Sequence, residues 1–334
     1  MKLSIASQAY LAHRSNGWSE STVKNDVKVL RKLINHIGDV NVAKISPEMM
    51  DEFLSSKPMN PSPGTYNLYF SGLRNFFKWC RQRKYMPIDH DPLVGQRIKP
   101  KPEVQQLRIP MEKFPALLSG ADRPRDRMII CIGLYLMVRE SEARSIQLKH
   151  INLSEGWIQI TVHKDPSKKI DRMPISPELD AELRTYLTWY AQQHGKLEDD
   201  WYLIPQYRFT NRWQEQEMNP TQGLGPGGMA RPIQRIVASL GYPTRRVGMH
   251  TLRRSAAAAV FLEKKRLGYD GALRQVAAWL HHKNQRTSEI YLGMDIDRNQ
   301  RDKEAREAPL YPSLQADNVT HIGEAHGNDP SQAV

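Results

Sequence analysis

Two stretches near the end of the chain decide how its fold is interpreted: HTLRRSAAAAVFLE at residues 250–263 and LHHKNQRTSEIYL at residues 280–292. The first places His250 three residues before Arg253 at the start of an alanine-rich helix, so both side chains lie on one helical face. The second contains two adjacent histidines and, nine residues after the latter, Tyr291. Each feature alone is common in folded proteins. Whether they indicate a functional site depends on the elements that precede them in the sequence.

Two further elements stand upstream. The run Arg139-Glu140-Ser141-Glu142 follows an apolar helical pattern over residues 123–138. Lys164 lies on a turn between two short β-rich runs, residues 157–162 and 170–175. The chain thus carries, in this order, an arginine–glutamate element, a hairpin lysine, a histidine–arginine element and a histidine–tyrosine element.

In this order and spacing, the four elements resemble the tyrosine recombinases, the family of phage integrases and chromosome-dimer resolvases. Arg139, Ser141 and Glu142 fit the family's Arg-x-Ser-Glu element, and His250 and Arg253 fit its His-x-x-Arg element. The resemblance covers about residues 1–300, and the motifs are highly specific as a set. It implies a mainly α protein with a small β-sheet, in which a helical core-DNA-binding domain precedes a mixed α/β catalytic domain.

The closing histidine and tyrosine fit the family with two departures. His282 and Tyr291 have the expected nine-residue separation, which favours His282 over its rival His281. The family often has glycine before the second histidine and in the segment before the first arginine. Here His281 and Met137-Val138 stand at those places.

The resemblance implies a role for each main candidate. Tyr291 would attack phosphorus and hold the 3′-phosphate as an ester, which conserves the bond energy for rejoining. Arg139 and Arg253 would each offer a fork of donors to the non-bridging oxygens in the transition state. His250 suits the proton transfer that a phenol with an ordinary pKa of about 10 needs.

A general acid is expected on the hairpin. Lys164 falls at the position of the family's hairpin lysine and would protonate the leaving 5′-hydroxyl. Lys168 and Lys169 lie in the same stretch and are rivals for this role.

Two residues would support this chemistry. His282 would hydrogen-bond the scissile phosphate, and Glu142 is expected to orient Arg253 or His250 rather than to exchange protons. No metal and no other cofactor are expected. The clustered carboxylates of a metal-dependent nuclease are missing near the histidines, and Arg253 disfavours a cation there.

The composition favours double-stranded DNA as the partner. Lys and Arg outnumber Asp and Glu by 48 to 36, and the pI is about 9.6. Residues 1–100 carry fifteen basic against eight acidic side chains, whereas residues 292–334 carry four against eight. A basic folded body is typical of a protein that binds a polyanion. No run approaches a membrane span and no membrane partner is expected. Cys80 and Cys131 are expected to be buried free thiols, so we expect a cytoplasmic, DNA-associated protein.

The front of the chain is predicted to be helical. Ser19 or Ser21 can cap a helix with one apolar stripe, and Ser46-Pro47-Glu48 opens a short helix with Met49 among its inward side chains. A third helix is predicted over residues 65–84, with an apolar face that includes Leu68. Its end is densely basic and is the expected DNA-binding surface: Lys78, Arg81, Arg83 and Lys84.

Four segments are expected along the chain. Residues 1–88 would form the helical core-DNA-binding domain, 89–103 a proline-containing linker, 104–306 the catalytic domain and 307–334 a polar tail. The helical pattern is under way by about Ser4, so we expect no additional small DNA-binding domain ahead of these helices.

The expected function is therefore site-specific recombination or integration, by cleavage and rejoining of DNA without metal. Since one active site cuts one strand, exchange between two duplexes implies a homotetramer on DNA. A catalytically inactive DNA-binding module of the same fold and a relaxing enzyme like a type IB topoisomerase are the alternatives. The complete set of candidate catalytic residues argues against the inactive module.

Overall fold

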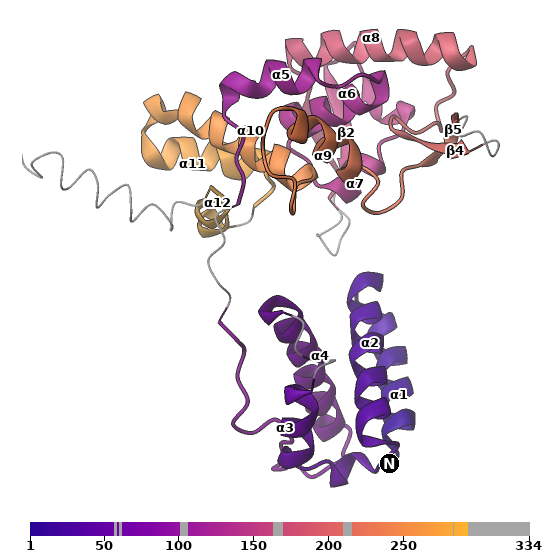
Figure 1. Ribbon diagram of the computed structural model, residues 1–334, viewed down its shortest axis with the longest axis vertical. Helices are drawn as coiled ribbons and strands as arrows, with labels where there is room; N and C mark the ends of the chain where they lie inside the picture. Colours follow the sequence, from indigo (N-terminus) through magenta and orange to yellow (C-terminus); the bar gives the residue numbers. More distant parts are fainter. Residues whose placement is uncertain are drawn as a thin grey trace, which may run out of the picture. The chain divides into compact units, whose positions relative to one another are not determined.

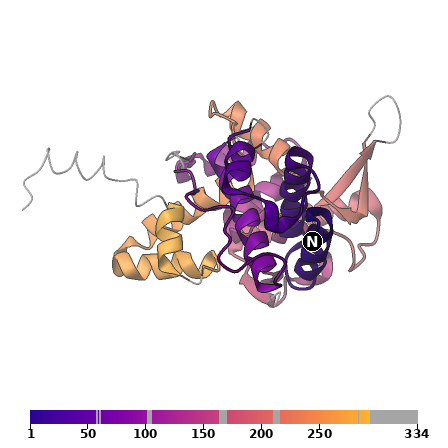
Figure 2. The same ribbon diagram turned by 90° about the horizontal axis from the view of Figure 1, so that it is seen from below.

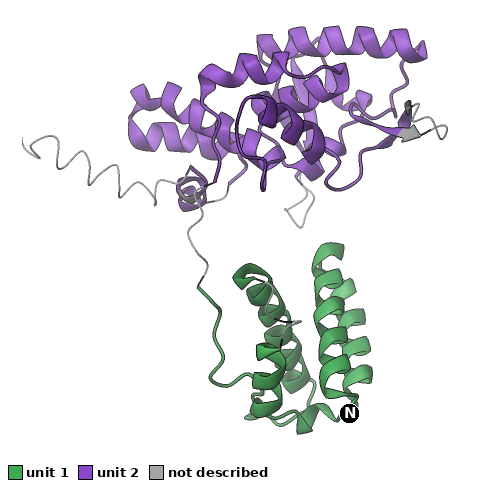
Figure 3. Ribbon diagram, in the orientation of Figure 1, with its two compact units in different colours: residues 1–104 green, residues 105–334 purple. Residues whose placement is uncertain are grey.

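The computed structural model describes residues 1–56, 59, 62–100, 106–162, 170–209, 216–282 and 284–292. The chain divides into two compact units, Met1–Val104 and Gln105–Val334 (Figure 3). Helices dominate the described part of both units, and the sheets there are small and antiparallel, which confirms the mainly α fold class. Over these residues, the structure contains no helix with the length and apolar character of a membrane span.

Unit 1 is helical throughout its described part. Its helices are α1 (Leu3–Ser15), α2 (Glu20–Ile37), α3 (Pro47–Ser55) and α4 (Pro63–Gln82), with the 3-10 turn η1 (Val42–Lys44) between α2 and α3 (Figure 1). The side chains of Ser19, Ser46 and Ser62 each accept a hydrogen bond from the backbone N–H three residues on, and so cap α2, α3 and α4. Of the two predicted caps Ser19 and Ser21, the structure has Ser19, and the predicted helix start at Ser46 is confirmed.

The buried faces of α3 and α4 differ from the prediction at two positions. Met50, rather than Met49, is fully buried, because it stands three and four residues before the other buried side chains of α3. Leu68 is 47% exposed. It lies two residues, or about 200° of helical rotation, from the buried Tyr66, and therefore faces away from the core.

Part of the expected linker packs against unit 1. Leu93 is buried in this unit's core. The side chain of Asn67 on α4 exchanges two hydrogen bonds with the backbone of Lys99, at 2.8 and 2.7 Å. The chain therefore follows α4 as far as Lys99.

Unit 2 begins with the helices that lead to Arg139. These are the 3-10 turn η3 (Met111–Lys113), α5 (Phe114–Ser119), α6 (Pro124–Cys131), the π-helical turn η4 (Ile132–Leu136) and α7 (Glu140–Arg144). The helix predicted over residues 123–138 is thus wrong at its end. Met137 has a positive φ of 50°, a left-handed conformation that an α-helix does not contain, so the chain turns there.

Two small antiparallel sheets follow. The first has the order β1 (Ile151–Asn152), β2 (Trp157–Thr161) and β3 (Ile170–Pro174), which confirms both predicted strands. The second is a hairpin of β4 (Pro205–Phe209) and β5 (Gln216–Gly223), which was not predicted. The polar sequence QEMNPTQG of β5, interrupted by Pro220, lacks the alternation that marks a strand.

The remaining helices carry most of the expected site. They are η5 (Leu148–His150), α8 (Pro177–His194), α9 (Ala230–Ser239), α10 (Met249–Glu263), η6 (Lys265–Leu267), α11 (Gly268–Trp279) and α12 (Gln285–Leu292). Within unit 2, α10, α11 and α12 gather at one end, and the β4–β5 hairpin lies at the opposite end (Figures 1 and 2).

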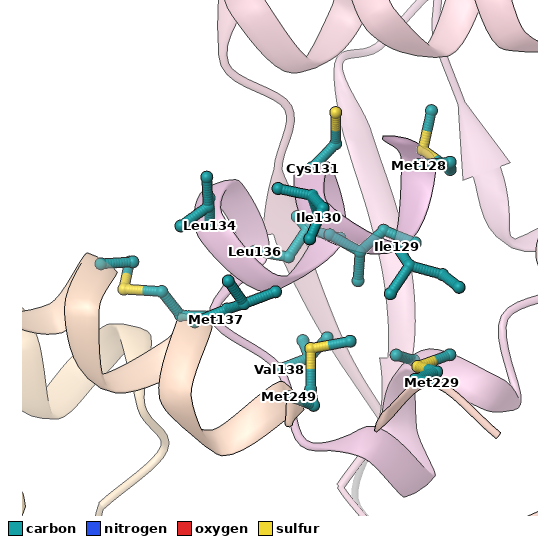
Figure 4. Close-up of a cluster of buried hydrophobic side chains, with 14 of the residues drawn as sticks. Met128, Ile129, Ile130, Cys131, Leu134, Leu136, Met137, Val138, Met229 and Met249 are labelled. Carbon is teal, nitrogen blue, oxygen red and sulfur yellow. The ribbon is translucent and has the colours of Figure 1, made fainter. Parts of the chain in front are cut away.

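Close packing of η4 on α10 fixes the chain just ahead of Arg139. A Cβ added to Gly133 would lie 2.7 Å from Cδ1 of Leu252, so only glycine allows this approach. Figure 4 shows Met137 and Val138 together with Met249 in this buried cluster. The core thereby brings the start of α7 next to the first turn of α10.

Candidate active site

Glu142 holds Arg139 at the start of α7. The Glu142 carboxylate is fully buried and accepts hydrogen bonds from the backbone N–H of Arg139 at 2.7 Å and from its Nη1 at 2.8 Å. Its second oxygen also lies 3.9 Å from Nη1 of Arg253. Glu142 was expected to orient Arg253 or His250; in the structure its hydrogen bonds go to Arg139, and its contact with Arg253 is longer.

Arg253 is a buried cation held mainly by backbone carbonyls. Its side chain is 1% exposed; Nη1 donates to the carbonyl oxygen of Met137, and Nη2 donates to that of Leu280 at 2.6 Å. Burial lowers the pKa of Arg253 to about 10, the nearby Arg139 acts in the same direction, and Tyr291 and Glu142 oppose it. Arg253 therefore stays charged at neutral pH, with its position set by two turns of the chain.

Tyr291 on α12 lies beside this cation. The carbon of the Arg253 guanidinium is 5.9 Å from the centre of the Tyr291 ring, and that of Arg254 is 5.3 Å from it. The Tyr291 hydroxyl donates to the backbone carbonyl of His250 at 3.4 Å. Burial raises the pKa of Tyr291, whereas the positive charges of Arg253, Arg254 and Arg139 lower it. Burial is the larger effect, so the pKa of Tyr291 lies above its ordinary value, and the phenol keeps its proton until a base removes it.

The two adjacent histidines point to different partners. The ring of His282 packs edge-on against Tyr291, with ring centres 5.5 Å apart, and its Nδ1 lies 2.9 Å from Oγ of the buried Ser288. His281 instead places its Nδ1 3.0 Å from Oδ2 of Asp171 on β3. The structure therefore brings His282, and not His281, against Tyr291.

His250 stands in the first turn of α10, one helical turn before Arg253, and its side chain is exposed. The structure brings its main chain to the Tyr291 hydroxyl. Lys164, Lys168 and Lys169 lie outside the described residues.

The basic run at the end of α4 divides into two kinds of side chain. Lys78 and Lys84 are exposed, and Arg83 is exposed with its guanidinium 5.8 Å from the centre of the Trp79 ring. Arg81 is engaged within unit 1, because its Nη1 donates to Asp91 and to the carbonyl of His90 at 3.1 and 3.0 Å. The exposed members are the ones placed to meet a partner from solvent.

Three site residues were missed in the sequence. Arg254 directly follows the matched Arg253, and its second positive charge was the signal for it. Ser288 precedes Tyr291 by one helical turn, but a serine in a polar stretch gives no signal of burial. Asp171 is 110 positions from His281 in the sequence, so only the fold brings the two together.

Over the described residues, the structure contains no group of three His, Cys, Asp or Glu side chains placed to hold a metal ion. Cys80 and Cys131 are buried free thiols, as predicted, and burial raises the pKa of each to about 12.

The fold and the convergence of Arg139, Arg253, His282 and Tyr291 define the class of enzymes that cleave and rejoin DNA through a tyrosine. The sequence model of the phage integrase family matches residues 103–297, and the chain belongs to this family. It is 22% identical over 258 residues to a tyrosine recombinase of Pseudothermotoga lettingae, a match that covers 76% of this chain and 80% of that protein.

Two solved structures show the same fold. A λ integrase dimer (residues 75–356) bound to a COC′ core site matches with a TM-score of 0.63 and 15% identity, over 85% of this chain and 96% of that one. The XerH site-specific recombinase, bound to a palindromic difH substrate in a post-cleavage complex, matches with a TM-score of 0.62 and 21% identity, over 86% and 80% of the two chains.

Proposed function

We propose that this enzyme exchanges strands between DNA duplexes, with Tyr291 as its nucleophile. The observation that carries the proposal is the cluster of Tyr291, Arg253 and His282. A phenol lies beside a buried guanidinium at 5.9 Å and a histidine ring at 5.5 Å. A phosphate oxygen bound to Arg253 would be within reach of the Tyr291 hydroxyl.

In the proposed reaction, Oη of Tyr291 attacks the scissile phosphorus, and the bond from phosphorus to the 5′-oxygen breaks. The products are a 3′-phosphotyrosyl ester and a free 5′-hydroxyl. Arg139 and Arg253 stabilise the negative charge on the non-bridging oxygens of the transition state. His282 donates a hydrogen bond to the same phosphate.

Two proton transfers accompany this step. His250 accepts the phenolic proton of Tyr291 through its imidazole. Its main-chain carbonyl accepts a hydrogen bond from that hydroxyl at 3.4 Å, so the residue lies next to the nucleophile. Lys164 gives a proton to the leaving 5′-oxygen, with Lys168 and Lys169 as the other candidates. Glu142 fixes Arg139 through two hydrogen bonds. Rejoining reverses these steps, with the 5′-hydroxyl of another strand as the attacking group.

The substrate is double-stranded DNA, held by both units. Residues 1–88 would form the core-DNA-binding domain, with Lys78, Arg83 and Lys84 of the basic run free to reach phosphates and Arg81 positioned through Asp91. Residues 89–103 would connect it to the catalytic domain at 104–306. Since one active site cuts one strand, exchange of four strands requires a tetramer. The buried thiols support an intracellular site of action.

The test is covalent trapping on DNA that carries a nick near the cleavage site, so that the cut fragment diffuses away. The wild-type chain should accumulate a protein–DNA adduct. Tyr291→Phe removes one hydroxyl and should abolish the adduct while DNA binding persists. Tyr207→Phe, on β4 in the hairpin at the end of unit 2 opposite α12 (Figure 1), is the matched control and should leave adduct formation unchanged. Adduct formation by Tyr291→Phe would disprove the assignment.

A further inference from the structure

His281 occupies a backbone position that is unfavourable for a histidine. Its φ is 50°, in the left-handed region that glycine adopts without strain, and the family often has glycine at this place. The same holds for Met137, whose φ is also 50°. Met137 is buried in the core, so packing explains its side chain. His281 needs a different explanation.

Among the residues that the structure describes, the His281 side chain makes a specific polar contact with Asp171. Its Nδ1 lies 3.0 Å from Oδ2 of Asp171, and the two side chains are 11% and 37% exposed. Asp171 is the second residue of β3 and pairs with Ile160 of β2. The pair therefore connects the turn after α11 to the strand that follows the stretch with the candidate lysine.

The residues on both sides of His281 contact the candidate active site. The carbonyl of Leu280 accepts the 2.6 Å hydrogen bond from Arg253, and His282 packs on Tyr291. A shift of this turn would therefore move two groups at once: the Leu280 carbonyl that binds Arg253, and the His282 ring beside Tyr291.

We infer that His281 is a positioning residue, which binds Asp171 and thereby fixes the 280–282 turn against β3 for DNA cleavage. The inference rests on the proposed function of Arg253, His282 and Tyr291. The His281–Asp171 pair connects the 280–282 turn to β3, and a glycine at position 281 would not provide this connection.

The charges around His281 set the form in which it acts. Burial lowers the pKa of His281 below its ordinary value, Asp171 and Glu142 oppose this shift, and Arg253 and Arg139 add to it. At neutral pH the ring is therefore uncharged and donates its Nδ1–H to Asp171. The buried Nε2 has no hydrogen-bond partner among the residues that the structure describes, which agrees with an unprotonated nitrogen. Protonation in acid would place a further positive charge beside Arg139 and Arg253.

The experiment compares His281→Gly, Asp171→Ala and the double variant. Glycine fits the left-handed backbone, so His281→Gly should fold at least as stably as wild type and isolates the loss of the ring. Single-turnover adduct formation on nicked DNA should fall about tenfold in each single variant and no further in the double variant, because residues that act as one unit are not additive. DNA affinity should change by less than about threefold. Asp180→Ala, which breaks a surface pair with Arg184, is the matched control and should have no effect.

A histidine NMR titration of the DNA-free chain, with the His281 signal assigned from the His281→Gly spectrum, provides a readout that cleavage does not affect. Asp171→Asn removes the negative charge beside the ring that favours protonation, so the pKa of His281 should fall further. Wild-type cleavage by His281→Gly, fully additive losses in the double variant, or an unchanged His281 pKa in Asp171→Asn would each overturn the inference. A wild-type chain that forms no adduct would instead contradict the proposed function, and the titration would still decide whether the pair exists.

Discussion

Arg14 in unit 1 and Arg253 in unit 2 are both buried, and the two are neutralised in different ways. In unit 1, Nε of Arg14 lies 3.0 Å from Asp26, and the guanidinium stacks 3.8 Å from the ring centre of Trp18. In unit 2, Arg253 and Arg139 share the single carboxylate of Glu142. One carboxylate balances one arginine in the first case and two arginines in the second.

From this difference we predict a structural role for Arg14 and a functional role for Arg253. A buried ion pair that is balanced one to one has no need of an external partner. A site with two largely buried guanidinium groups and one carboxylate keeps about one net positive charge away from solvent, which an anion from outside, such as a DNA phosphate, would compensate. Loss of Arg14 should therefore reduce stability, and loss of Arg253 should reduce the reaction rate.

The largest effect is expected for Arg253→Lys, which keeps the charge but loses the planar fork of donors. Single-turnover adduct formation should slow by about a hundred- to a thousandfold, because a contact made in the transition state is lost. DNA binding should persist. Arg184→Lys changes an exposed arginine that pairs with Asp180 on α8, so it serves as the control. An adduct rate for Arg253→Lys within threefold of wild type would contradict the functional role that distinguishes Arg253 from Arg14.

A smaller effect, of a different kind, is expected for Arg14→Met. It leaves the buried Asp26 carboxylate without its partner and should lower the free energy of unfolding by about 3–5 kcal/mol in urea denaturation of the full chain. Lys24→Met removes an exposed pair with Glu20 and should leave the free energy of unfolding close to that of wild type, because solvent screens such a pair. At a temperature where Arg14→Met is folded, the adduct rate per bound enzyme should match that of wild type. A loss of rate without a loss of stability would contradict the structural role of Arg14.

The smallest effect is expected for removal of metal ions. Excess EDTA should change adduct formation by less than about twofold, since the two arginines supply the charge that a metal ion would otherwise provide. If EDTA abolishes the adduct and Mg²⁺ restores it, with DNA binding unaffected, a metal ion supplies the positive charge for cleavage. The two arginines that share Glu142 would then not be the main binding site for the phosphate.

The sequence was most informative where chemistry limits the choice of residue. Residue type and spacing indicated Arg139, Arg253 and Tyr291 as candidates, and the structure brings them together. Capping side chains indicated the helix start at Ser46 and limited the earlier start to Ser19 or Ser21. These signals are local. They need no knowledge of how distant segments meet.

The features that escaped prediction depend on tertiary contacts or on rare backbone conformations. The helix before Arg139 ends at Met137 because its φ is positive, and methionine does not signal such a turn. The β4–β5 hairpin forms by pairing of segments with weak strand character. The Asp171–His281 pair joins residues 110 positions apart. In each case the cause lies in the folded arrangement rather than in the neighbouring sequence.

The central claim, that the charge of Arg253 is kept for the scissile phosphate, can be tested by removing charge from the DNA. A methylphosphonate at the cleavage site lacks one negatively charged oxygen, so it should need less positive charge from the protein. For each protein, the adduct rate on methylphosphonate DNA is divided by the rate on ordinary DNA. This ratio should be about tenfold or more higher for Arg253→Ala than for wild type. Arg14→Met should show the wild-type ratio. An equal ratio for Arg253→Ala and wild type would mean that Arg253 does not face the phosphate, and would contradict the account.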